Sequence, residues 1–279
     1  MNKEDLAEAL NNVRATTPLV HCITNYVTVN DCANALLACG GSPIMSAEPD
    51  DVKDITSICG GLVLNIGTLT KRSIKGMKKA GKRATSLGHP IVLDPVGAGA
   101  SALRTATSGE LLDTLGITVI RGNMSEIKAV AGAASATRGV DVNPDDVVTE
   151  ENLASSAAFA RKLAKKTGAV IAITGAIDIV ADADRAVAIR NGHPIMGKMT
   201  GSGCILSCIV AAYVVANGQK PLEAVVAAVA GEGLCGEIAF ARMAEGDGNG
   251  SFRTYLLDAM YNLNAQQLAD GARIEEIVA

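Results

Sequence analysis

Short apolar runs, separated by longer amphipathic stretches, constrain the fold of this chain more than any other feature. The runs are rich in β-branched residues and apolar on both faces, which is typical of strands buried in a parallel sheet. Six such strands are predicted, at Leu19–Ile23, Pro43–Met45, Leu62–Ile66, Ile91–Asp94, Thr118–Ile120 and Val170–Thr174. Helical patterns lie between and after them, at about 29–38, 50–58, 70–87, 102–115, 124–131 and 150–167.

The remaining third of the chain follows a different pattern. Residues Ile177–Ala181 and Ala186–Arg190 flank a polar turn, which predicts an antiparallel hairpin at one edge of the sheet. Helices are predicted at 203–216, 221–243 and 251–269, and a loop at 134–149. We therefore expect a single α/β domain over residues 1–279, with a central, mostly parallel sheet and helices on both faces.

Composition and charge exclude several classes of function. The net charge is −4, from 25 basic and 29 acidic residues, which argues against binding nucleic acid or an anionic membrane. No run of about 18 residues is free of polar groups, so no membrane span is expected; residues 203–217 come closest. The 7 cysteines include no CxxC pair, which favours a reduced, cytoplasmic protein.

A glycine-rich turn, Thr200-Gly201-Ser202-Gly203-Cys204, opens one of the predicted helices. Backbone amides at such a turn converge on one point, and the helix dipole makes that point favourable for phosphate. Cys204 lies beside it, where we expect a thiol with a lowered pKa that is able to exchange a proton. The turn indicates an enzyme that transfers a phosphoryl group.

Other polar residues and glycines follow the predicted strands and should meet at one edge of the sheet. Asp94 and Glu126 would supply two hard oxygen ligands for Mg²⁺, and the guanidinium of Arg121 suits phosphate. Two structural alternatives stay open, because Asp94 also suits a turn and Asn123 with Glu126 also suits a helix-capping box. The same edge would gather Asn25, Met45, Gly67 and Thr174.

Two apparent nucleotide-binding motifs are set aside. Gly76–Arg83 is similar to a P-loop but has arginine where a magnesium-binding Ser or Thr is needed. Gly231–Gly236 matches the pattern GxGxxG but follows a predicted helix instead of a strand, which favours close helix packing. No histidine spacing points to zinc or to a Ser-His-Asp triad.

Taken in order along the chain, these blocks resemble the hydroxyethylthiazole kinase family. The resemblance runs from about residue 18 to residue 261 and is carried by Leu19–Asn25, Ser42–Met45, Asn65–Thr70, Leu93–Val96, Ile120–Glu126, Arg138–Asp141, Thr200–Cys204 and Gly250–Phe252. It implies a ribokinase-like three-layer sandwich. It also implies phosphorylation of 4-methyl-5-(2-hydroxyethyl)thiazole by ATP and Mg²⁺ in thiamine salvage.

The resemblance also implies roles for individual residues and a homotrimer with thiazole sites at the subunit interfaces. Cys204 stands where related kinases carry an aspartate base. The thiazole would contact Met45 and Gly201, with Asn25 and Gly67 close by. ATP would be bound by Arg121, Thr174, Asn123 and Gly203. Mg²⁺ would be bound by Asp94 and Glu126. Two departures are mild: Ser202 replaces a common threonine, and Ala176 stands where an acidic residue is frequent.

Three other functions remain open from the sequence. One is a hydroxymethylpyrimidine kinase of the same fold, and the second is a nicotinamide-hydrate dehydratase, against which Cys204 argues. The third is a non-catalytic thiazole or thiamine sensor. Intact Asp94, Glu126 and Arg121 argue against a sensor, which would not need magnesium ligands.

Overall fold

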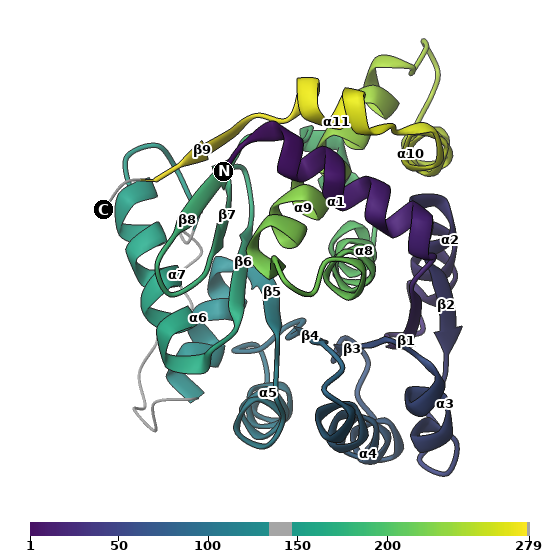
Figure 1. The fold of residues 1–279 in the computed structure, drawn as a ribbon, viewed down its shortest axis with the longest axis vertical. Helices are drawn as coiled ribbons and strands as arrows, with labels where there is room; N and C mark the ends of the chain where they lie inside the picture. Colours follow the sequence, from purple (N-terminus) through teal and green to yellow (C-terminus); the bar gives the residue numbers. More distant parts are fainter. Residues whose placement is uncertain (134–146, 278–279) are drawn as a thin grey trace.

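The computed structural model of the chain describes residues 1–133 and 147–277. Within these residues nine strands form one sheet across the middle of the molecule, in the order β2-β1-β3-β4-β5-β6-β7-β8-β9 (Figure 1). The first six strands in this order, from β2 to β6, are parallel to one another, and the pairs β6–β7, β7–β8 and β8–β9 are antiparallel. The strands are β1 Leu19–Ile23, β2 Ser42–Met45, β3 Gly61–Asn65, β4 Ile91–Asp94, β5 Val119–Asn123, β6 Val170–Thr174, β7 Asp178–Ala181, β8 Ala186–Ile189 and β9 Ile274–Glu276.

Helices cover both faces of the sheet (Figure 1). One face carries α1 Lys3–Thr16, α2 Val29–Cys39, α8 Ser202–Ala216, α9 Pro221–Ala241, α10 Asn249–Asn262 and α11 Ala265–Gly271. The other face carries α3 Val52–Ile58, α4 Lys71–Leu87, α5 Ala102–Thr114, α6 Met124–Ala133 and α7 Leu153–Thr167. A 3₁₀ turn, Pro194–Lys198, connects β8 to the glycine-rich turn. The three-layer α/β architecture agrees with the fold class predicted from the sequence.

The strands build two hydrophobic cores because their side chains alternate between the two faces. Val63, paired with Val92 in the register, belongs to the first core, where β3 contacts α8. Leu93, paired with Ile120, belongs to the second core, where β4 contacts α4. Both faces are apolar, and the strands are therefore continuous hydrophobic runs.

Helix α9 is long and apolar enough to cross a membrane by length and composition, and 78% of its apolar window is buried in the fold. It belongs to the first core together with α8. The sequence pointed instead to residues 203–217 as the nearest candidate, because Glu223 and Glu232 interrupt the apolar run of α9. We therefore interpret α9 as a core helix of the fold.

The structure corrects the predicted elements at the carboxyl terminus and in β5. The helix predicted over 251–269 is two helices, because α10 ends at Asn262 and Asn264 caps α11 with a reciprocal bond to Gln267. Strand β9 was not predicted and pairs with β8. Strand β5 continues to Asn123, so Arg121 lies within the strand instead of after it. Residues 134–146 of the predicted loop and all of Arg138–Asp141 lie outside the described residues.

Candidate active site

A hydrogen-bonded cluster lies where β1, β3 and β4 end. Asn65 and Asp94 are register partners at the ends of β3 and β4, and the Asn65 Nδ2 donates to Asp94 Oδ2 at 2.7 Å. Asn25 follows β1, and its Nδ2 donates to Asn65 Oδ1 at 3.1 Å. Both amides also donate to Cys204 Sγ at 3.2 Å. The parallel strands therefore bring the predicted residues Asn25, Asp94 and Cys204 together.

The orientation of the two amides is fixed by the backbone around them. Asn25 Oδ1 accepts hydrogen bonds from the amides of Val27 and Thr28 at 3.1 and 3.2 Å. Asn65 Oδ1 accepts one from the amide of Gly67 at 2.9 Å. Each Nδ2 group is therefore turned toward Cys204, which receives two hydrogen-bond donors.

Asp94 is fully buried and only one of its two oxygens has partners. Oδ2 accepts bonds from Asn65 and from the Ser207 hydroxyl at 2.8 Å, and Arg121 Nη1 lies 3.7 Å away. Oδ1 is buried without a partner. Burial raises the pKa of Asp94 to about 6, although the charge of Arg121 acts in the opposite direction. A buried, unpartnered oxygen on a carboxyl group is suited to accept a cation.

The cysteine does not have the lowered pKa that its place at a helix start predicted. Cys204 is buried, and burial together with the negative charge of Asp94 raises the pKa of its thiol. The side-chain hydrogen bonds from Asn65, Thr28 and Asn25 lower the pKa by less. Burial beside a carboxyl group therefore leaves Cys204 a neutral thiol at neutral pH.

The turn before α8 needs glycine at its first position. Gly201 has φ of +87°, and a Cβ there would lie 2.3 Å from Thr28 Cγ2. The first backbone bond of the helix runs from Ile205 N to Gly201 O at 2.9 Å, so the amides of residues 202–204 precede the helical ladder. Within the described residues no side chain caps this helix. The amides are therefore free to bind an anion, as the prediction from the sequence requires.

Gly201→Ala should therefore lower both activity and stability. The left-handed φ costs alanine about 1 kcal/mol or more, and the methyl group would push Thr28 away from Asn25. We expect a loss of more than about 10-fold in kcat/KM, because the shifted turn displaces the amides and Cys204. Enzyme kinetics and thermal unfolding measure the two effects.

Gly246→Ala is the matched control for that variant. Gly246 has φ of +90°, and a Cβ there would have nothing within 4 Å. It should lose stability through the same backbone strain and keep its activity. Equal kinetics for the two variants would contradict the account of the turn.

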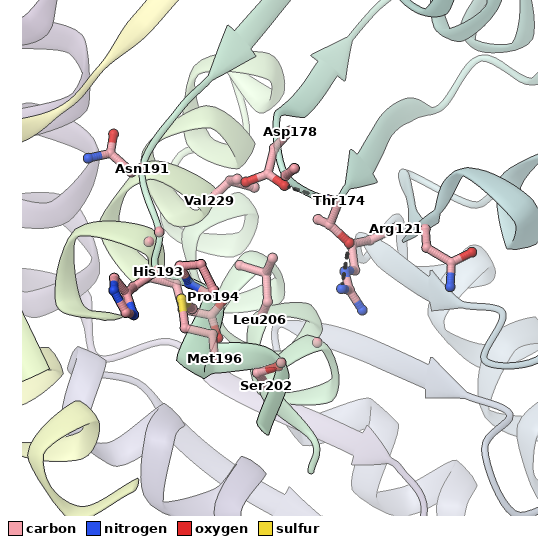
Figure 2. Close-up of a pocket in the computed structure, with 18 residues that line it drawn as sticks. Arg121, Thr174, Asp178, Asn191, His193, Pro194, Met196, Ser202, Leu206 and Val229 are labelled. Atoms are coloured by element: carbon pink, nitrogen blue, oxygen red, sulfur yellow. Dashed lines mark hydrogen bonds between the residues drawn. The ribbon is translucent and has the colours of Figure 1, made fainter. Parts of the chain in front are cut away.

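A cavity of about 690 Å³ opens beside the start of α8 (Figure 2). All four predicted ATP residues line it, namely Arg121, Asn123, Thr174 and Gly203. Arg121 Nη2 donates to the Thr174 hydroxyl at 2.7 Å, and a Cβ on Gly203 would lie 2.4 Å from Arg121 Nη1. The Arg121 Nε atom is buried without a partner. The guanidinium thus lies against the amide turn with hydrogen-bonding capacity to spare.

Glu126 accepts hydrogen bonds from backbone amides, as in the helix-capping box that the sequence left open as an alternative. Its oxygens accept bonds from the amides of Gly97 at 2.8 Å and Asn123 at 2.9 Å, and Asn123 Oδ1 accepts a bond from the Glu126 amide. Its charge also raises the pKa of Asp94, so the two carboxyl groups lie within electrostatic reach. A carboxylate with two bonds retains further lone pairs for a cation.

The donor set fits Mg²⁺ carried by phosphates. In the described part of the chain no group of three or more His, Cys, Asp or Glu is arranged to hold a metal. Mg²⁺ characteristically binds one or two carboxylates and takes its other ligands from phosphates and water. The free Oδ1 of Asp94, with Glu126 nearby, matches that requirement.

Met45 lies apart from the hydrogen-bonded cluster. It ends the edge strand β2 opposite Cys22 and packs against the first core. Gly67, by contrast, touches the cluster, since a Cβ there would lie 3.0 Å from Asn25 Nδ2. The four predicted thiazole residues are therefore spread from the edge of the sheet to the α8 turn.

Several polar residues of the site were not selected from the sequence. Asn65 ends a strand as Asp94 does, so the strand-end rule would have found it. Ser207 is one helical turn after Gly203, and its place gives no signal in the sequence. Asp178 and Glu232 line the cavity, and Glu232 lies in the GxGxxG stretch that the sequence assigned to packing. That assignment agrees with the structure, because a Cβ on Gly233 would lie 2.7 Å from the Asn191 backbone.

The sheet order, the edge hairpin and the amide turn define a ribokinase-like protein. A ribokinase-like superfamily protein from Enterococcus faecalis V583 shares this fold, with a TM-score of 0.58, 13% identity and coverage of 93% of this chain and 94% of its own. The hydroxyethylthiazole kinase family model matches residues 10–266. The chain belongs to the hydroxyethylthiazole kinase family.

Two relatives are similar over nearly their whole length. The hydroxyethylthiazole kinase of Clostridium acetobutylicum is 54% identical over 270 residues, which is 97% of this chain and 99% of the relative. The structure of the hydroxyethylthiazole kinase protein from Pyrococcus horikoshii OT3 has a TM-score of 0.87 and 36% identity. The match covers 98% of this chain and 99% of the Pyrococcus horikoshii chain. The family named from the sequence blocks is therefore confirmed.

Proposed function

We infer that the protein phosphorylates the hydroxyl group of 4-methyl-5-(2-hydroxyethyl)thiazole with ATP, in thiamine salvage, as a cytoplasmic enzyme. Beyond family membership, the observation that supports this most is the buried Asp94, which keeps one oxygen free while its other oxygen lies near Arg121 and bonds to Ser207 of α8. Phosphoryl transfer needs such positioning and charge stabilisation more than covalent help. One domain, residues 1–279, carries the whole reaction.

The residues of the cavity act on the phosphates. The amides of residues 202–204 bind oxygens of the transferred phosphoryl group, and Arg121, positioned by Thr174, neutralises its developing charge. Asn123 and Gly203 line the space for the nucleotide. Mg²⁺, held through Asp94 with help from Glu126, would supply Lewis-acid neutralisation of the phosphates.

The thiol of Cys204 faces the acceptor alcohol and orients it without being a strong base. Its two amide donors and raised pKa suit a neutral hydrogen-bonding group. Cys204→Ala should therefore lower kcat by about 10²-fold or less, since a general base typically contributes about 10²–10⁴-fold. Steady-state kinetics with intact ATP binding measures the effect.

Cys204→Asp and Cys204→Ser refine this test. Aspartate would accept the amide bonds of Asn25 and Asn65 and supply a base, so its activity should equal or exceed that of the wild type. Serine keeps a hydroxyl at the position and should lie between alanine and cysteine. Complete inactivity of Cys204→Ala with unchanged ATP affinity would refute the neutral role of the thiol.

Thiazole is bound near Asn25, Gly67 and Gly201, and Met45 completes its site in a homotrimer. An exposed apolar surface supports an interface here, because Tyr26 and Val27, directly after Asn25, are 78% and 56% exposed. Large apolar side chains left exposed beside a site are typical of an interface. Sedimentation analysis should show a trimer, and a monomer that is fully active at assay concentration would contradict this part of the proposal.

The activity is tested by ADP release from Mg-ATP with different acceptors. We expect release that depends on hydroxyethylthiazole and is absent with hydroxymethylpyrimidine or without an acceptor. Release with the pyrimidine alone would mean that the protein is a hydroxymethylpyrimidine kinase of the same fold. A folded, ATP-binding protein without acceptor-dependent release would favour the dehydratase or the sensor.

A further inference from the structure

The long core helix α9 carries three glutamates, and one of them has no protein partner. Glu223 pairs with Arg185 at 2.8 Å, and Glu237 pairs with Arg273 at 2.7 Å. Glu232 makes no hydrogen bond or ion pair within the described residues, and its Oε1 atom is buried and unpartnered. The residue is 6% exposed and lines the same cavity as Arg121 and Thr174.

A buried carboxyl group without a partner is costly to the fold. Leaving one polar group unsatisfied costs about 1–3 kcal/mol, and more for a charged group. Burial raises the pKa of Glu232 to about 8 and that of Asp178, also on the cavity wall, to about 7. The charge of Arg121 counteracts both shifts, so both acids lie within reach of the cation that faces the phosphates. Such a group fits a ligand that brings hydroxyl donors.

The lining of the cavity suits the three parts of a nucleotide. Arg121 and the α8 amides mark the phosphate end. Figure 2 shows Asp178 beside Thr174 on the side toward Val229. The apolar part of the lining is formed by Pro194, Met196, Leu206 and Val229. A flat base suits the apolar wall, and the sugar of a nucleotide lies between its base and its phosphates.

We propose that Glu232, with Asp178 beside it, binds the ribose hydroxyls of ATP and makes the enzyme selective for ribonucleotides. This inference rests on the proposed kinase function, because it assigns the nucleotide to this cavity. Asp178 keeps one bond to the protein, from the Gly175 amide at 2.8 Å, which holds its carboxyl group at the start of β7. Glu232 has no such bond within the described residues, so the ribose supplies the hydrogen bond that the fold leaves unmade.

Binding of ATP, 2′-deoxy-ATP and 3′-deoxy-ATP to the wild-type protein tests whether the site recognises the ribose hydroxyls. At least one deoxy analogue should have a Kd, by calorimetry without acceptor, that is higher by about 10-fold or more. KM in the thiazole assay should rise in parallel, with kcat little changed. Equal Kd values for all three nucleotides would overturn the proposal.

Variants of Glu232 test whether this residue is the one that recognises the ribose hydroxyls. Glu232→Met removes the acceptor and, because the carboxyl group has no protein partner, should not destabilise the fold. It should bind ATP and the deoxy analogues alike, to within about 2-fold, while Glu232→Gln retains an acceptor and most of the discrimination. The exposed Glu245→Met is the matched control and should behave as the wild type.

Full discrimination in Glu232→Met would overturn the assignment of the sugar to this residue. Should that variant fail to fold, the wild-type comparison and Glu232→Gln still decide. Failure of the proposed function is separate, since it would appear as nucleotide binding without phosphorylation of thiazole by any nucleotide.

Discussion

Asp94→Asn should reduce kcat/KM for thiazole phosphorylation by about 10³-fold or more and leave the protein folded. Asn65, Ser207 and Arg121 surround the Oδ2 side of Asp94, and an asparagine oxygen placed there preserves their contacts. The amide group then replaces Oδ1, the oxygen without a partner. An amide nitrogen cannot bind a cation, so the variant removes the proposed metal contact and little else.

The fold of this variant should be at least as stable as that of the wild type. Asp94 is fully buried and burial raises its pKa, so its ionised form is unfavourable in the native state. A neutral isostere removes that cost. Raising the Mg²⁺ concentration should restore little activity. Asp184→Asn, in the exposed β7–β8 turn, is the control with the same chemical change. Near-normal activity of Asp94→Asn would mean that the phosphates are neutralised elsewhere.

Arg121→Met should lower kcat by about 10³-fold, with a smaller change in the KM for ATP. A positioned arginine contributes about 10³–10⁵-fold to phosphoryl transfer by stabilising the transition-state charge. Methionine preserves most of the buried stem and removes the guanidinium that bonds to Thr174. The loss should therefore fall on the transition state more than on ground-state binding.

The pH dependence of Arg121→Met provides an independent check. The charge of Arg121 lowers the pKa of Asp94, so removing it should raise that pKa above its wild-type value of about 6. The residual activity should then increase between pH 7 and 8, where more Asp94 becomes ionised, while the wild-type profile is flat there. Arg72→Met, at a surface side chain that is 72% exposed, should leave both kcat and the pH profile unchanged. An unshifted profile in Arg121→Met would show that the two side chains are not coupled.

The sheet could be predicted because its strands are short, β-branched and apolar on both faces, as in Leu62–Leu64 and Ile91–Leu93. The C-terminal strand could not, because β9 has three residues and two of them are exposed glutamates. The break between α10 and α11 depends on one capping residue, Asn264, without the glycine or proline that usually marks a helix end. A single capping residue or a short polar strand gives only a weak signal in the sequence.

The candidate site was predictable where strand ends or a turn determine it. Asp94, Thr174 and Cys204 meet because parallel strands end at one edge and α8 begins there. The pKa of Cys204 was predicted with the wrong sign, because the helix start is visible in the sequence while burial beside Asp94 is a tertiary property. Glu232 was missed for the same reason, since only the fold shows that its buried carboxyl group lines the cavity beside Arg121 without a partner among the described residues.

The central claim is that this site transfers a phosphoryl group from ATP to the alcohol of the thiazole. Mass spectrometry of the products after incubation with Mg-ATP and hydroxyethylthiazole tests it most directly. The account predicts the thiazole monophosphate ester together with an equal amount of ADP. ADP with free phosphate, or an unchanged thiazole in the presence of folded protein that binds ATP, would contradict it.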